Sequence, residues 1–264
     1  MIYLMMAGAG LLAGLLAGVF GIGGGVILVP VLLVVFQQMG LADAQVMQLA
    51  VGTSLAIIVL TSSVSSFSHH RHGYLRWDRW AWLAPGLVLG GWLGGAVAHR
   101  VHSDWLELAF GIFFVLMAGQ IAFEILPSRP REGKADARLS LAGVVVGTIS
   151  SLVGVGGGVM VVPLLLWTGT AAAEAVATSA ACTLVVALAG TSAFIYQGWS
   201  LSDLPQPSLG YVYLPAVAGF AIASMLAAPW GARLAHRLPR NILRRAFALL
   251  LVGVGAWMVM GAVA

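Results

Sequence analysis

The charged residues of this chain are confined to short stretches that alternate with long apolar blocks. All 13 Lys and Arg residues fall in four places: 71–79, Arg100, 129–138 and 233–245. The blocks between them are long enough to cross a bilayer as helices, which takes about 20 residues each. With 60% hydrophobic and 8% charged residues, the chain has too little polar surface for a soluble domain. The sequence therefore predicts an all-α polytopic membrane protein.

The chain contains two copies of one unit. The block GVFGIGGGVILVP at 18–30 returns as SLVGVGGGVMVVP at 151–163, with corresponding glycines and prolines 133 positions apart. Further along, VGTS at 51–54 matches VATS at 176–179 at an offset of 125. Such a repeat predicts a duplicated fold. We expect a first repeat over 1–126, a cytoplasmic linker over 127–138 and a second repeat over 139–264.

Each copy divides into a glycine-broken segment and three apolar spans. The broken segment, about 30 residues long, would make a helix of about 45 Å, whereas the hydrocarbon core measures about 30 Å. The segment therefore either crosses the membrane once, although it is longer than the hydrocarbon core, or turns at the glycines and leaves the membrane on the side where it entered. The expected segments are 2–37, 46–67, 80–98 and 105–126 in the first copy, and 139–170, 172–196, 211–232 and 242–263 in the second.

The distribution of positive charge decides between these two topologies, because Lys and Arg collect in cytoplasmic loops. Single crossings divide the 13 charges seven against six, which is no bias. Hairpins bring twelve of them to one side and leave Arg100 opposite. We therefore expect a glycine-broken helical hairpin and three transmembrane helices in each repeat, inverted topology between the repeats, and both termini outside. Whether each hairpin is re-entrant or a pair of short spans stays open.

The two glycine tips are the predicted substrate site. A new helix is expected after each tip, and its first N–H groups have no partner within the helix. Such an end carries about half a positive charge and binds anions. Pro30 and Pro163 follow as predicted helix breaks, because proline leaves the carbonyl four residues earlier without its usual bond. The predicted tip residues are Gly23, Gly24, Gly25, Gly156, Gly157 and Gly158.

Hydroxyls that match between the copies are the next candidates. Thr53, Ser54, Thr178 and Ser179 could donate to an anion, or they could bond to the backbone of their own helices, and both interpretations stay open. His69, His70 and His72 beside Arg71 fit a cytoplasmic anchor better than a proton relay.

Several other functions do not fit the sequence. An intramembrane enzyme needs an embedded nucleophile with a base, or paired aspartates, and the aspartates lie in loops or at span ends. The sequence has no phosphate-binding loop and no nucleic-acid module, and nothing in it indicates a cofactor or a metal site. The lone Cys182 is expected to pack as a core residue. A non-transporting scaffold or assembly protein and an anion channel remain as alternatives.

The doubled block GVFGIGGGVILVPVLL and SLVGVGGGVMVVPLLL, with the GTS and ATS stretches and the HHRHG loop end, resembles the TauE/SafE family of sulfite and sulfonate exporters. The similarity covers both copies. It implies a secondary transporter in the bacterial inner membrane that exports small sulfur-containing anions such as sulfite or organosulfonates. The expected partners are the anionic substrate and membrane lipid, with a proton as the candidate coupling ion and a homodimer as the candidate assembly. At Leu152 and Val153 the second copy departs from the first, so no role passes from Phe20 to Val153.

Overall fold

A computed structural model describes residues 2–20, 25–41, 43–123, 137–201, 203–235 and 239–263, which form ten helices and one two-stranded hairpin. The first half contains α1 (Ile2–Phe20), α2 (Gly25–Gln38), α3 (Asp43–Arg71), α4 (Trp77–Arg100) and α5 (Ser103–Phe123). The second half contains α6 (Ala137–Val153), α7 (Gly158–Trp167), α8 (Ala172–Gly198), α9 (Leu214–Ala235) and α10 (Arg240–Val263).

Both expected breaks at the glycines are confirmed, since α1 and α2 are separate helices, as are α6 and α7. Among the described residues, five helices are long and apolar enough to cross a membrane, in α3, α4, α5, α8 and α10. The second arms of the broken segments are shorter. The 14 residues of α2 and the 10 of α7 correspond to about 21 and 15 Å, less than the bilayer core.

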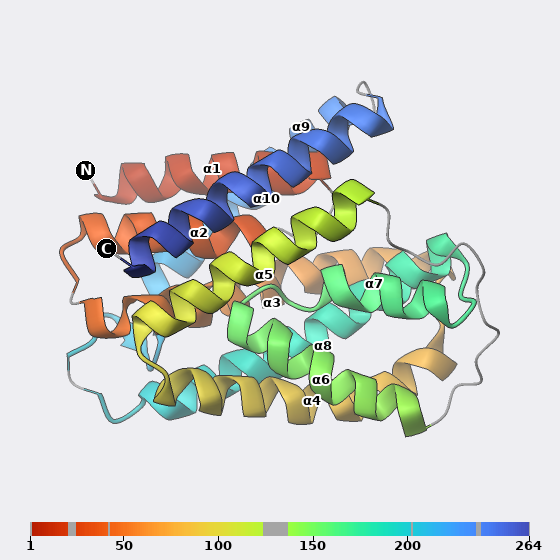
Figure 1. Ribbon diagram of the computed structural model, residues 1–264, viewed down its shortest axis with the longest axis horizontal. Helices are drawn as coiled ribbons and strands as arrows, with labels where there is room; N and C mark the ends of the chain where they lie inside the picture. Colours follow the sequence, from red (N-terminus) through yellow and green to blue (C-terminus); the bar gives the residue numbers. More distant parts are fainter. Residues whose placement is uncertain are drawn as a thin grey trace.

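The helices pack in pairs that combine the two halves of the chain. Helix α1 lies along α9, α4 along α6, and α5 along α10 (Figure 1). Helices α3 and α8 pack against each other, with α2 against α3 and α7 against α8. Both chain ends lie at one end of the molecule, whereas α4, α6 and α10 begin at the opposite end. The described cations at the starts of these three helices, such as Arg79 and Arg138, therefore share one end.

Glycines make the close helix contacts. A Cβ on Gly90 of α4 would lie 2.2 Å from the Val144 carbonyl oxygen of α6, and one on Gly14 of α1 would lie 2.4 Å from Ser224 Cα of α9. On the other side of α4, Gly91 lies against α8. Small residues allow membrane helices to approach backbone to backbone, and these glycines serve that purpose between α1 and α9 and on both sides of α4.

The start of the third span in the second copy differs from expectation. Helix α9 begins at Leu214, and the preceding residues form a short antiparallel hairpin, β1 (Ser208–Leu209) and β2 (Val212–Tyr213). The turn needs Gly210, because its φ is +52° and a Cβ there would lie 2.3 Å from the Ile195 carbonyl oxygen. Tyr211 in the turn and Tyr213 in β2 are both buried. The connection from α8 to α9 is thus longer than that from α3 to α4.

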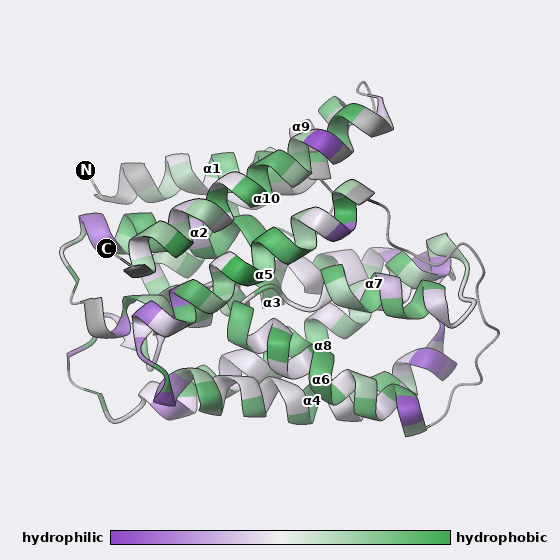
Figure 2. Cartoon of the chain, in the orientation of Figure 1, coloured by the Kyte–Doolittle hydropathy of each residue, from purple (hydrophilic) through white to green (hydrophobic). Residues whose placement is uncertain are grey.

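The outer surface of the bundle is apolar. Large side chains such as Leu116, Ile222 and Leu249 are more than 60% exposed, and hydrophilic residues gather toward helix ends (Figure 2). A soluble monomer rarely exposes apolar surface on this scale. The surface therefore fits lipid contact by a multi-pass membrane protein.

Candidate anion site at the glycine tips

The second glycine tip has a backbone that only glycine adopts readily. After α6 ends at Val153, Gly154, Gly156 and Gly157 have φ values of +62°, +64° and +81°. This left-handed region costs other residues about 1–2 kcal/mol each. The Val155 N–H donates to the Ser150 carbonyl oxygen at 3.0 Å and closes the end of α6. The glycines therefore reverse the chain within a few residues.

Helix α7 begins at this tip without a side-chain cap. Its N-cap residue is Gly157, which has no side chain to accept a hydrogen bond from the first turn. The Gly157 carbonyl accepts from the N–H groups of Met160 and Val161 at 3.0 and 2.9 Å. Pro163 lies within α7 and has no N–H to offer the Val159 carbonyl. The tip thus presents a helix N-terminus next to a weakened first turn.

The start of α2 meets the second tip. A Cβ on Gly25, the first residue of α2, would lie 2.9 Å from Val155 Cα and 3.1 Å from the Gly154 carbonyl oxygen. The same position touches Ile58 of α3, and Ile58 also contacts Gly156. The start of α2 therefore lies against the turn that leads into α7, which belongs to the other half of the chain. The predicted tip residues Gly23 and Gly24 lie outside the described residues.

The matched serines bind the second tip from two sides. The buried Ser54 Oγ of α3 donates to the Gly154 carbonyl oxygen at 3.1 Å, and Ser179 Oγ of α8 donates to the Gly158 carbonyl oxygen at 3.3 Å. The structure thus brings both serines to the tip, where they hold carbonyl groups. Their role as donors to a substrate stays a prediction.

The matched threonines have backbone partners elsewhere. Thr53 Oγ1 accepts from the Tyr213 N–H at 3.1 Å, directly before α9, and Thr178 Oγ1 accepts from the Arg76 N–H at 3.0 Å, directly before α4. Each threonine therefore anchors the start of a helix that belongs to the other half of the chain.

Two further hydroxyls lie at the second tip that sequence reasoning missed. A Cβ on Gly157 would lie 3.4 Å from Ser150 Oγ, and one on Gly158 would lie 3.3 Å from Thr183 Oγ1. Both side chains are buried. Thr183 follows Ser179 by one helical turn, and this spacing was a usable signal. The tip thus combines a helix N-terminus, hydroxyls and apolar neighbours such as Ile58 and Val186, and polar interactions are stronger in such a low-dielectric setting.

This architecture defines the class of protein. Helix breaks at membrane depth are tolerated only where protein or a wet cavity satisfies the backbone, and secondary transporters use such broken helices for substrate binding. The family model described as sulfite exporter TauE/SafE matches residues 6–258. The chain therefore belongs to the TauE/SafE family.

Relatives carry names that agree with this class. A probable membrane transporter protein of Haemophilus influenzae is 34% identical over 246 residues, which covers 93% of each chain. Another, from Methanocaldococcus jannaschii, is 28% identical and covers 95% of this chain and 93% of its own. A third, YunE of Bacillus subtilis, is 35% identical over 42% of this chain and 38% of its own. No solved structure matches. The family and these relatives identify a membrane transporter.

Proposed function

We propose that the protein is a secondary transporter that exports small sulfur-containing anions, such as sulfite or organosulfonates, and that the anion binds where the two glycine tips meet. The observation that carries this proposal is the contact of Gly25 with Gly154 and Val155. A helix N-terminus attracts an anion with about 0.3–2 kcal/mol, most strongly when it is partly buried. Two such ends beside one another would supply a site without any charged side chain.

The inverted repeat is part of the proposal, and helix packing supports it. Exchanging the first five helices with the last five turns the α1–α9 pair into α6–α4, and α2–α3 into α7–α8. The pairs α3–α8 and α5–α10 map onto themselves. A two-fold axis in the membrane plane, passing through the tips, accounts for these correspondences. In this arrangement 127–138 would be a cytoplasmic linker, with both termini on the other side of the inner membrane.

The test replaces one tip glycine and one control glycine by alanine. In Gly157→Ala the new methyl group enters the tip, and losing about 1–2 kcal/mol of anion binding should lower the apparent affinity of sulfite transport about tenfold. Gly40→Ala is a control for backbone strain, because Gly40 has a φ of +69° and nothing within 4 Å of its Cβ position, and it follows the end of α2 that is remote from the tip. Both variants are assayed in proteoliposomes that contain sulfite, sulfoacetate, taurine, sulfate or a carboxylate.

The outcomes separate the alternatives. If Gly157→Ala transports sulfite with normal affinity and rate, the tips do not bind the substrate. If both variants lose the same amount of transport affinity, backbone strain explains the loss. Flux that does not saturate with substrate would indicate a channel. A scaffold protein would show neither flux nor stabilisation by any of the anions, since a ligand that binds the native state raises its melting temperature.

A further inference from the structure

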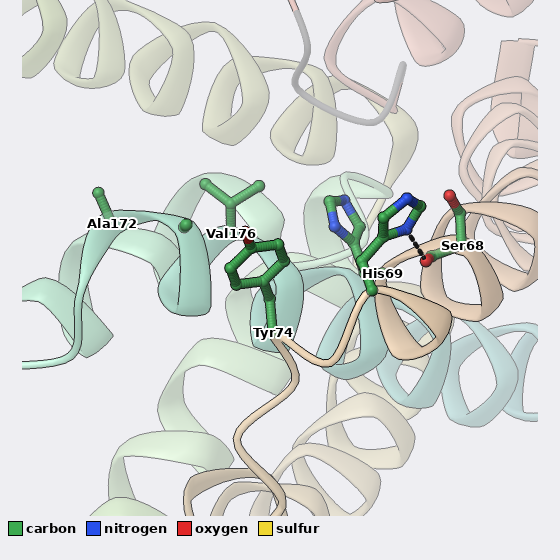
Figure 3. Close-up of a pocket in the computed structure, with 7 residues that line it drawn as sticks. Ser68, His69, Tyr74, Ala172 and Val176 are labelled. Atoms are coloured by element: carbon green, nitrogen blue, oxygen red, sulfur yellow. Dashed lines mark hydrogen bonds between the residues drawn. The ribbon is translucent and has the colours of Figure 1, made fainter.

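A hollow of about 570 Å³ opens between the end of α3 and the start of α8. Figure 3 shows Ser68, His69 and Tyr74 on one side of it and Ala172 and Val176 on the other. The remaining lining residues are His72 and Ala173. It lies at the same end of the molecule as the start of α4.

The polar groups of this hollow suit an anion. His72 Nδ1 lies 2.7 Å from the Ser68 carbonyl oxygen, and because a carbonyl oxygen only accepts, Nδ1 is the donor of this hydrogen bond. Ala172 and Ala173 form the first turn of α8, whose N-cap Ala171 provides no side-chain hydrogen bond. Protonated imidazoles and a helix N-terminus are both attractive to negative charge.

The acidic residues near the hollow are already paired. Glu174 of α8 accepts from Arg76 at 3.2 Å, and Asp78 of α4 accepts from the same guanidinium at 2.8 Å. The hydrogen bond with Asp78, followed by that with Glu174, raises the pKa of Arg76 above its ordinary value, so this group stays charged. Other titratable groups at this end include His70, Tyr74 and the cations Arg71 and Arg79, so that the charges of Arg71, Arg76 and Arg79 outnumber those of Asp78 and Glu174. The local balance therefore remains positive.

Two helix faces connect the hollow with the glycine tip. On α3, Ile58 contacts Gly156 at the tip, Ser62 follows one turn later, and His69 reaches the hollow. The Ser62 hydroxyl is buried and has no hydrogen-bond partner among the described residues. On α8, Thr183 lies at the tip and Val176 at the hollow. From Ile58 to His69 the helix rises about 16 Å, half of a bilayer core.

We infer that the hollow is a second anion site, a cytoplasmic vestibule where His69 and His72 collect small sulfonates before they pass Ser62 to the tips. The vestibule rests on the proposed function for its place on a transport path, but its binding can be measured alone. Histidine is the side chain that commonly changes charge near neutral pH, so anion binding in a hollow lined by His69 and His72 should be stronger at pH 6 than at pH 8.

The first test measures binding of methanesulfonate, which keeps one negative charge across this pH range. With the purified full chain carrying ¹⁵N-labelled histidine, the ring resonances of His69 and His72 should shift on addition of the anion. The affinity should fall between pH 6 and pH 8. In the double variant His69→Gln, His72→Gln the pH dependence should disappear. His70→Gln is the matched control, because His70 lies at the same helix end without lining the hollow.

The second test places a negative charge in the vestibule without harming the fold. In Ala173→Glu the carboxylate occupies the first turn of α8, where it favours the helix, yet repulsion of about 1 kcal/mol should weaken methanesulfonate binding about fivefold. Ala173→Gln adds similar bulk without the charge, so it is the control for steric effects and should bind methanesulfonate more tightly than Ala173→Glu. Equal affinity for these two variants, or an unchanged pH profile in the double histidine variant, would overturn the vestibule.

Failure of the vestibule and failure of the tip site are distinguishable. Gly157→Ala should lower the apparent affinity of sulfite transport but keep the histidine shifts. If no sulfur anion is transported while those shifts persist, the tip proposal fails and the vestibule stands.

Discussion

At the scale of single residues, the tip owes its shape to glycines and its attachment to hydroxyls. The sequence could identify the glycines, since a repeated GGG followed by proline interrupts an apolar helix in both copies. It could not identify what Thr53 and Thr178 bind, because their partners lie 160 and 102 positions away. Sequence spacing reports on neighbours along one helix, whereas these contacts depend on how the two halves dock.

The threonine anchor gives a prediction for stability. Thr178→Val keeps the shape of the side chain but removes the acceptor of the Arg76 N–H, which should destabilise the protein by about 1–3 kcal/mol. Thr178→Ser keeps the oxygen and should remain near the wild type. Thermal denaturation in detergent compares the three proteins. If valine and serine melt at the same temperature, the hydrogen bond contributes nothing to the anchor.

At the scale of helices, glycine has two uses that the structure separates. In α4 and α6 it permits backbone contact, whereas at the tip it permits a turn. Periodic glycines in an apolar span indicate the first use. The short hairpin before α9 was not predictable in the same way, because its strands have two residues each and alternation of polarity needs a longer run.

Alanine should have opposite effects at a glycine in the α4–α6 contact and at a glycine of α5 that has open space around it. Gly90→Ala should destabilise the protein by about 1–3 kcal/mol, because the new methyl group would overlap the Val144 carbonyl and overpacked contacts cost this much. Gly119→Ala meets nothing within 4 Å and should stabilise α5 by up to about 1 kcal/mol, because alanine favours helix. Melting temperatures test the sign of each change. A harmless Gly90→Ala would mean that α4 and α6 can separate at little cost.

At the scale of the whole molecule, topology follows from the hairpins. If both broken segments return to their own side, residues after α3 and after α7 share one face of the membrane, and residues after α2 and after α8 share the other. Single crossings would separate the members of each pair. Charge counting predicted the hairpins from the sequence, whereas the pairing of α1 with α9 needed coordinates.

Cysteine labelling tests this topology with little background, because the native Cys182 is buried. Each of the exposed positions Gln38, His70, Ala171 and Ser200 is replaced singly by cysteine and treated with a membrane-impermeant maleimide in intact cells. We expect labelling at positions 38 and 200 and protection at 70 and 171, with permeabilised cells as the control. Different labelling of positions 70 and 171 would contradict the hairpin topology.

The pairing of α1 with α9 also has a consequence for the order in which the helices can pack during synthesis. Ser224 donates to the Gly10 carbonyl across 214 positions of sequence. At about 5–20 residues per second, the ribosome needs about 10–40 s to extend the chain from one helix to the other. During that interval the close-packing face of α1 has no partner from its own chain, so lipid or an insertion chaperone must cover it until the last fifth of the polypeptide emerges.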